Sequence, residues 1–191
     1  RYLPNDHVTG IAMGDQGTAY VRTDAGWSAI KTVEHTLHEK ADYLLVRYVA
    51  RHRRLGMPSP AYYPSPDDTS TWTYAPQPSD ALWTSYFVTS MAMAYSLTGE
   101  ARYRELAKEG MEALYLLQNV TGIPGLVARS VVAIDEPTVP QLITEDNWHE
   151  TEDGQYIWRD DVSSDQLTGH FFAFYTYYEH IAKHDSKERA L

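Results

Sequence analysis

Cysteine is absent from the 191 residues, so disulfide bonds and thiolate metal sites are excluded and the redox compartment cannot be read. No run of about 18 apolar residues occurs, which predicts that no segment spans a membrane. Glycine-rich phosphate loops and the Gly-x-Ser-x-Gly elbow are also missing, which disfavours nucleotide chemistry and the common serine-hydrolase layout. The chain begins at Arg1 without an initiator methionine or signal peptide, so we expect a processed product or a segment of a longer chain.

Positive charge is scarce: 16 Lys and Arg residues face 26 Asp and Glu residues, and the formal net charge is −10. Nucleic acids and anionic membranes need a basic face, so neither is expected as the main partner. We interpret the one basic run as cations at the C-terminal end of a predicted helix; it consists of Arg47, Arg51, Arg53 and Arg54.

Metal ligands are poorly represented as well. His180 and His184 are four residues apart, a spacing that places both on one helical face, but no third ligand accompanies them. The sequence therefore predicts no metal site and no cofactor.

Aromatic side chains, in contrast, are abundant. They make up 13 % of the chain, with 15 tyrosines and five tryptophans. Tyrosine and tryptophan combine a flat apolar face with a polar group, which suits a groove that holds sugar rings. The same side chains also fill helix interfaces, and the hydrophobic share of 43 % predicts a packed core.

The N-terminal part of the chain changes from one periodicity to another. Apolar residues alternate with small or polar ones between Gly-rich turns, which predicts a β-meander over residues 1–30. Apolar residues at three- and four-residue steps then predict a helix over 36–55. This helix begins with a capping-box pattern of Thr36 and Glu39, and Gly56 is placed to end it.

Prolines mark a long loop over residues 57–78, among them Pro66, Pro76 and Pro78. Its aromatic residues suit either a binding lip or a stiff connector. Beyond it the apolar spacing predicts three further helices, over 79–97, 100–120 and 164–184. The Asp153-Gly154 pair predicts a small β-hairpin over 147–158, whereas 123–132 shows no regular period.

Several of these segments resemble one known family. Asp80-Ala-Leu-Trp-Thr, and Ala94 to Gly99 followed by Tyr103, are similar to the repeating unit of the six-hairpin glycosidase-like (α/α) toroids. Four further segments resemble an uncharacterised bacterial branch of that superfamily. They are Val120 to Gly125, Ala128-Arg129-Ser130, Trp158 to Asp165 and Gly169 to Phe172. Gly17 to Trp27 resembles the last strands of a β-propeller blade of the two-component-regulator sensor type.

The resemblance implies a mainly α fold. Residues 31–191 would form helical hairpins of an incomplete (α/α) toroid, with a small β-hairpin, and residues 1–30 would be a β-meander that ends a propeller blade. The remainder of a longer chain, or another copy, would complete the toroid. The resemblance also implies a periplasmic or extracellular location and a carbohydrate, an oligo- or polysaccharide, as partner.

Carboxylates are the candidate catalytic groups. Asp80 begins a predicted helix, either as an ordinary first-turn acid or as a general acid or base at the groove of a toroid. Asp160, Asp161 and Asp165 crowd one loop, and neighbouring carboxylates can raise one another's pKa, so that one acts as an acid and another as a base. We therefore expect Asp80 with Asp161 or Asp165 to flank a glycosidic bond; Asp165 is otherwise a first-turn anion.

Other side chains are candidates for binding or proton transfer. His170 is either a hydrogen-bonded core histidine or a base that abstracts a proton from a uronic acid. Arg129 either pairs with a substrate carboxylate or bridges to one of the acids. The candidate substrate-binding residues are Trp83, Tyr86, Arg129, Trp148, His149 and Trp158.

Four functions fit these residues. Hydrolysis of a glycosidic bond is favoured, and a polysaccharide lyase that acts on a uronic-acid glycan is its enzymatic alternative. A non-catalytic glycan-binding or sensory module is favoured by the propeller-like start and by the single acid in Gln77 to Ala81, where the family carries Asp-Asn-Asp-Gly. A purely structural helical scaffold is the fourth.

Overall fold

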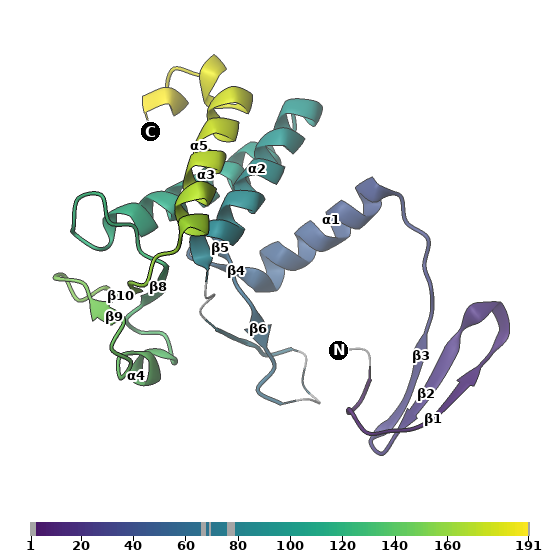
Figure 1. Ribbon diagram of the computed structural model, residues 1–191. Coiled ribbons are helices and arrows are strands. Elements are labelled where there is room, and N and C mark those ends of the chain that lie inside the picture. Colours follow the sequence, from purple (N-terminus) through teal and green to yellow (C-terminus); the bar gives the residue numbers. More distant parts are fainter. Residues whose placement is uncertain (1–2, 66–67, 69, 76–78, 191) are drawn as a thin grey trace. The chain divides into compact units, whose positions relative to one another are not determined.

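The computed structural model describes residues 3–65, 68, 70–75 and 79–190. The chain divides into two compact units, whose elements Figure 1 labels. Unit 1 comprises Arg1–Arg51 and Ala61–Thr73, and unit 2 comprises His52–Pro60 and Tyr74–Leu191.

Unit 1 contains a three-stranded antiparallel meander of β1 (Val8–Met13), β2 (Ala19–Thr23) and β3 (Gly26–Ile30), in that order. Val21 of the central strand lies opposite Ile11 on one side and Ser28 on the other. The β-meander that the alternation of apolar and polar residues predicted is therefore confirmed.

The first helix, α1 (Leu37–Arg47), begins at the predicted capping box. Thr36 Oγ1 accepts a hydrogen bond from Glu39 N at 3.2 Å, and the Glu39 carboxylate accepts one from Thr36 N at 2.8 Å. Two amide groups at the helix start are thereby satisfied. A π-helical turn over Tyr48–His52 follows, so the regular helix ends earlier than predicted.

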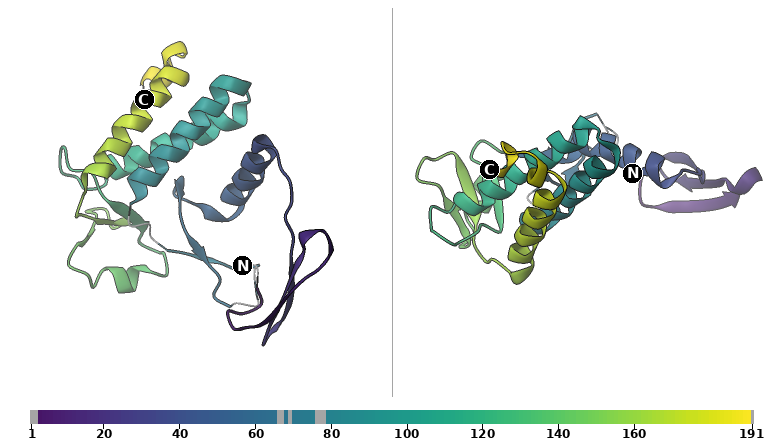
Figure 2. Two further views of the ribbon diagram at one scale, coloured as in Figure 1. Left: turned by 45° about the vertical axis from the view of Figure 1, so that its right-hand side comes forward. Right: turned by 90° about the horizontal axis from the view of Figure 1, so that it is seen from above.

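Three long helices form the body of unit 2: α2 (Asp80–Thr98), α3 (Ala101–Asn119) and α5 (Ser164–His180). Gly99, in the left-handed conformation, ends α2, and α3 runs back along it. α5 runs parallel to α2, beside it in Figures 1 and 2, and the hydroxyl oxygens of Thr89 and Thr176 are 2.8 Å apart. The sequence predicted each of these helices to within a few residues.

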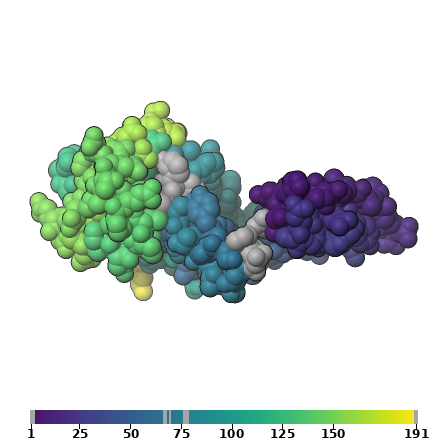
Figure 3. All heavy atoms as spheres, turned by 90° about the horizontal axis from the view of Figure 1, so that it is seen from below, coloured from purple at the N-terminus to yellow at the C-terminus, as the bar shows by residue number. Residues whose placement is uncertain are grey.

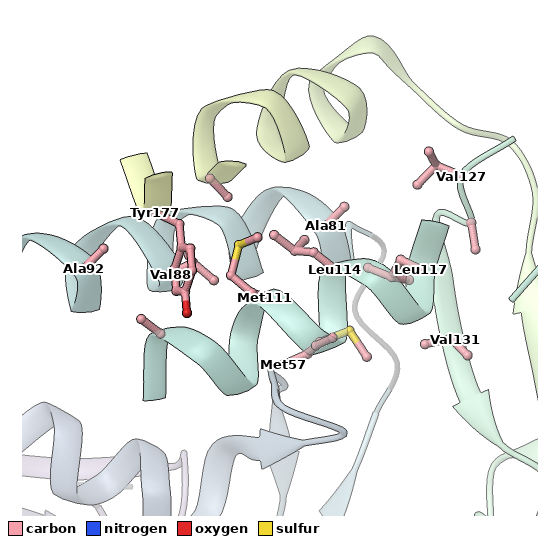
Figure 4. Packing of buried hydrophobic residues seen from close by; sticks show 14 of the residues in the cluster. Met57, Ala81, Val88, Ala92, Met111, Leu114, Leu117, Val127, Val131 and Tyr177 are labelled. Atoms are coloured by element: carbon pink, nitrogen blue, oxygen red, sulfur yellow. The ribbon is translucent and has the colours of Figure 1, made fainter. Parts of the chain in front are cut away.

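The main hydrophobic core of unit 2 lies among these helices. Figure 4 shows Tyr177 of α5 beside Val88 of α2 and Met111 of α3. Met57 belongs to the same cluster, in which Val88, Leu114 and Leu117 are fully buried. Gly110 of α3 permits the close packing, because a Cβ at this position would lie 2.6 Å from Cγ2 of Val88.

A tight hairpin replaces the end of the helix that was predicted over 36–55. β4 (Arg53–Arg54) pairs antiparallel with β5 (Met57–Pro58). The turn residues Leu55 and Gly56 have φ angles of 50° and 76°, as a two-residue hairpin turn requires. A Cβ on Gly56 would lie 2.9 Å from the carbonyl oxygen of Glu109, so only glycine fits against α3 here. The predicted helix stop is therefore a hairpin turn.

The stretch predicted as a long loop contains two short strands. β6 (Ala61–Tyr62) and β7 (Thr73–Tyr74) form a two-stranded sheet. The parts of the predicted loop that carry Pro66, Pro76 and Pro78 lie outside the described residues.

Unit 2 also contains a second three-stranded sheet, in the order β8-β10-β9, made of β8 (Ser130–Ala133), β9 (Trp148–Glu150) and β10 (Tyr156–Arg159). The short helix α4 (Val139–Leu142) lies between β8 and β9 in the chain. A small core of Val132, Val139, Trp148 and Ile157 lies beneath it. Figure 3 shows this segment in green, as much of one face of unit 2.

The expectation of a mainly α fold, made for an incomplete (α/α) toroid, is wrong as to fold class. Helices hold 46 % of the described residues and strands hold 19 %, in small antiparallel sheets, so the fold is mixed α and β. The hairpin of β9 and β10 was predicted, but the strand β8 that pairs with it was missed. β8 has only four residues, and its neighbours Val131 and Val132 are both buried, so the sequence shows no alternation of apolar and polar residues there. None of the described helices is long and apolar enough to cross a bilayer.

Candidate functional site

Asp80, the candidate acid of α2, is fully buried in the first turn of the helix. Its Oδ2 accepts hydrogen bonds from Ser130 Oγ at 2.5 Å and from Val131 N at 3.3 Å. The guanidinium of Arg54 lies 3.4 Å from the same oxygen. Oδ1 is also buried and has no hydrogen-bond partner within the described part of the chain.

Arg54 links Asp80 to the sheet. Its side chain is 4 % exposed, and Nη1 donates to the carbonyl oxygen of Val131 at 2.7 Å and to Glu136 Oε1 at 3.2 Å. Nε donates to Ser59 Oγ at 3.3 Å. A buried guanidinium is tolerated only with such partners, because an unpaired buried charge costs several kcal/mol. Arg54 is a buried residue of β4, so its interpretation as a cation at the C-terminal end of a helix is wrong.

The surroundings of Asp80 favour its protonated form. Burial raises the pKa of its carboxyl from 3.8 to about 6, and Glu136 adds to the rise. Arg54 and the hydrogen bonds from Ser130 and Val131 act in the opposite direction. Asp80 can therefore hold a proton at mildly acidic pH, but in this conformation water and substrate do not reach it.

Arg129 organises the loop that carries the other candidate acids. Its Nη1 donates to the carbonyl oxygen of Asp161 and to Ser163 Oγ, each at 2.9 Å. Ser163 in turn donates to the carboxylate of Asp165, which lowers the pKa of that carboxyl. Asp161 itself is exposed and has a φ of 60°, in the left-handed region that few non-glycine residues adopt. Arg129 thus holds the loop through a carbonyl and a hydroxyl group.

The candidate acids are connected through two consecutive residues. The amide of Asp80 donates to the carbonyl oxygen of Arg129 at 3.3 Å, and Ser130 donates to its carboxylate. The side chain of Arg129 holds the loop of Asp161 and Asp165. One acid is therefore inside the molecule and the other two are at its surface, on either side of the same short segment.

His170 is buried between α5 and α3, with 2 % of the residue exposed. Nδ1 lies 3.0 Å from the carbonyl oxygen of Gln166, and Nε2 lies 3.3 Å from that of Leu114. Both partners are acceptors, so a neutral imidazole, which has a single N–H, can donate to only one of them. Phe174 contacts the imidazole edge-on, with 5.8 Å between ring centroids.

The imidazole of His170 lines a hollow of about 560 Å³ between the C-terminal end of α3 and α5, which we call hollow A. Its wall is mostly apolar, and Gln118 and Asn119 add two side-chain amides. The remaining lining residues come from the loop after α3 and from α5: Gly122, Ile123, Pro124, Gly125, Val127, Leu167, Phe171 and Phe174.

A second hollow, hollow B, has a volume of about 590 Å³ and lies on the other side of the same loop. Tyr156 and Trp158 of β10 line it. Acidic residues of the β9–β10 hairpin stand at its edge: Glu150, Glu152 and Asp153. The hydroxyl of Thr151 and the amide of Gln155 bind the carboxylate of Asp153 and lower its pKa, so this group stays ionised.

The loop between the two hollows is rigidly hydrogen-bonded. Thr121 Oγ1 accepts a hydrogen bond from Ile123 N at 3.1 Å and donates one to the carbonyl oxygen of Leu126 at 3.0 Å. Asn119, Gly122 and Ile123 line both hollows. The two hollows therefore share one wall, and a chain-like ligand could contact both.

The other predicted binding residues are dispersed. His149 Nε2 lies 2.8 Å from the carboxylate of Asp160, and its ring lies 4.6 Å from that of Trp158. Trp148 is buried in the small core beneath the sheet. Trp83 and Tyr86 are exposed on α2, with 6.2 Å between their ring centroids.

Of the ten candidate residues, therefore, the structure places only His170 and Trp158 in the linings of the two hollows. The sequence reading missed Asn119, Tyr156 and Phe174, because nothing in the sequence shows that the end of α3, β10 and α5 meet. It also missed the partners of Asp80, namely Arg54, Ser130 and Glu136. The described residues contain no cluster of three or more His, Asp or Glu side chains that could hold a metal ion.

No protein-family model, curated protein or solved structure matches the chain. Its function therefore has to be inferred from its own geometry.

Proposed function

We propose that the protein binds an oligo- or polysaccharide in hollows A and B. The observation that carries this proposal is that aromatic rings line both sides of one shared wall: Phe171 and Phe174 in hollow A, and Tyr156 and Trp158 in hollow B. Sugar rings present an apolar C–H face that stacks on aromatic rings, and their hydroxyl groups need amide or carboxylate partners at the rim. Asn119 and the acids of the hairpin supply such partners.

The charges of the residues that line the two hollows narrow the class of glycan that can bind. No Lys or Arg occurs among the described residues that line either hollow, whereas hollow B carries three acids. A uronic-acid glycan would meet repulsion there without a compensating cation. The proposal is therefore a glycan without carboxylates, and the lyase alternative is less well supported. Such a ligand fits a periplasmic or extracellular protein, and the resemblance to a glycosidase-like family stays a prediction that points the same way.

Titration calorimetry with a panel of neutral and acidic oligosaccharides tests the binding. Phe171 is 64 % exposed, so Phe171→Ala removes a ring from hollow A without opening the core. We expect at least tenfold weaker binding, which corresponds to about 1.4 kcal/mol. The matched control is Tyr178→Ala, which removes a ring of the same helix that is 46 % exposed and lies outside the hollow. Equal losses in both variants, or no binding to any oligosaccharide, would contradict the proposal.

Cleavage of a glycosidic bond is a second candidate function, favoured by one observation. The pKa of Asp80 is raised to about 6 while that of Asp165 is lowered, and glycosidases need one protonated and one ionised carboxyl group. Asp80 would have to become accessible when substrate binds. Asp80→Asn and Asp165→Asn should each abolish product formation and leave binding in the hollows unchanged. Product formation by either variant would exclude the pair.

A further inference from the structure

The solvent-facing side of α2 carries no charge. Among its 19 residues the one Asp, Glu, Lys, Arg or His side chain is Asp80, which is fully buried. A helix at the surface of a soluble protein normally presents charged residues to water. The outward stripe of α2 is instead Trp83, Tyr86, Ser90, Met93 and Leu97.

This stripe follows a repeat of three and four residues, the spacing of a helix that packs along another helix. Tyr86 is 53 % exposed and Leu97 is 86 % exposed. The structure buries only the side of α2 that faces α3 and α5. The opposite side is apolar as well, and it stays exposed.

α5 extends the same face. Phe172 contacts Tyr86 edge-on, with 6.3 Å between ring centroids, and Tyr175 follows one turn later, exposed like Phe172. Because α2 and α5 are parallel neighbours, the two rows form one continuous surface, which we call the α2/α5 face. Tyr86 and Phe172 lie near the middle of their helices, where interfaces concentrate their binding free energy.

We propose that the α2/α5 face is the interface of a two-fold symmetric dimer of this chain. Its size fits a second copy: a helix of 19 residues is about 28 Å long, and two helices whose axes are about 10 Å apart present a face about 20 Å wide. The projected area is about 560 Å², which approaches the roughly 800 Å² that each partner contributes to a stable interface once the corrugation of the side chains is included.

The chemistry also fits a second copy. A two-fold axis places each face against its own image, so like charges within the face would be brought together. The α2/α5 face avoids this at its centre, where the residues are aromatic, Met and Ser. Glu179, one turn after Tyr175 on α5, is already paired with Lys183 at 3.0 Å. A two-fold axis perpendicular to the helices makes the helices of the two copies antiparallel, which is the arrangement of an antiparallel four-helix bundle. This interface is independent of the glycan hollows, since Trp83 and Tyr86 line neither of them.

Sedimentation equilibrium of the full chain tests the proposal. We expect a dimer, and Tyr86→Glu and Phe172→Glu should each weaken it at least tenfold by placing a charge in the centre of the face. Ile143→Glu is the control, since Ile143 is similarly exposed in unit 2 but lies beyond these helices. Circular dichroism checks that each variant is folded. A wild-type chain that stays monomeric at its highest soluble concentration overturns the proposal.

A second measurement identifies the face itself. The chain has no cysteine, so Ser90→Cys introduces a single site for a spin label in the middle of the stripe. A dimer through the α2/α5 face should give a defined dipolar distance between the two labels that disappears with Tyr86→Glu. A dimer that persists unchanged with Tyr86→Glu and Phe172→Glu would show that another surface, or another occupant, is involved, and would also overturn the proposal.

Discussion

The carboxyl group of Asp80 lies where water does not reach, and two segments distant in sequence hold it in place. Arg54, Ser130 and Val131 come from a hairpin and from β8, and each contacts the same oxygen. A group in such surroundings couples folding to proton uptake, because the unfolded chain returns the carboxyl to water. The direction of the coupling follows from the direction of the pKa shift.

Protonation of Asp80 should make the stability of the folded chain depend on pH. Below pH 3.8 the carboxyl of Asp80 is protonated in both states; between pH 3.8 and about 6 only the folded state keeps the proton, so stability falls as the pH rises. The whole shift corresponds to about 3 kcal/mol. Asp80→Asn keeps an acceptor for Ser130 and removes the titration, so its stability relative to wild type should increase between pH 4 and 6.

Urea unfolding at several pH values measures this difference. Asp153→Asn serves as a control with the opposite sign, because the pKa of Asp153 is lowered in the folded state and its contribution is lost as the pH falls. Parallel pH profiles of wild type and Asp80→Asn would contradict the prediction.

At the level of elements, close helix packing depends on a glycine of α3. The missing side chain of Gly110 leaves room for Val88 of α2, which is completely buried. The axes of α2 and α3 lie close together at this point, so the side chains at positions 88 and 110 compete for the same space.

We expect Gly110→Ala to destabilise unit 2 by about 1 kcal/mol, because overpacking outweighs the gain in helix propensity. Val88→Ala should cost about 2 kcal/mol by leaving a cavity. In the double variant the new methyl group occupies that space, so its loss should be about 1 kcal/mol smaller than the sum of the single losses. Chemical unfolding of all four proteins gives the comparison, and simple additivity would show that the two residues do not compete for space.

How well the sequence predicted each element depends on how far its signals extend. The helix from Asp80 to Thr98 and the turn at Gly154 are encoded within a few neighbouring residues, and the structure confirms both. β8 pairs with β10, and Gly56 of the β4–β5 hairpin packs against Glu109 of α3. Both contacts are with residues far along the chain, and local patterns gave the wrong structure there. The candidate site was the hardest part to predict, because the hollows form where the end of α3, α5 and the β9–β10 hairpin meet.

For the molecule as a whole, the net charge of −10 acts on its association. Two copies with this charge repel one another at long range, whereas the α2/α5 face itself is uncharged. Added salt shortens the range of the repulsion without weakening apolar contacts, since the Debye length falls from about 30 Å at 0.01 M to about 10 Å at 0.1 M.

The proposed dimer should therefore become tighter as ionic strength rises over this range. Sedimentation equilibrium in a salt series measures the dissociation constant directly. An interface made of ion pairs would weaken instead, and a dissociation constant that rises with salt would contradict an uncharged interface.

Arg54 also bears on the order in which the chain folds. Its partners Val131 and Glu136 are 77 and 82 residues away in sequence, so these bonds close a long loop. Closing such a loop is entropically unfavourable until neighbouring structure exists, and we expect the α2–α3 hairpin to be formed in the folding transition state before Arg54 is enclosed. The contacts of Arg54 would then slow unfolding, and removing them would increase the unfolding rate while the folding rate stays almost unchanged.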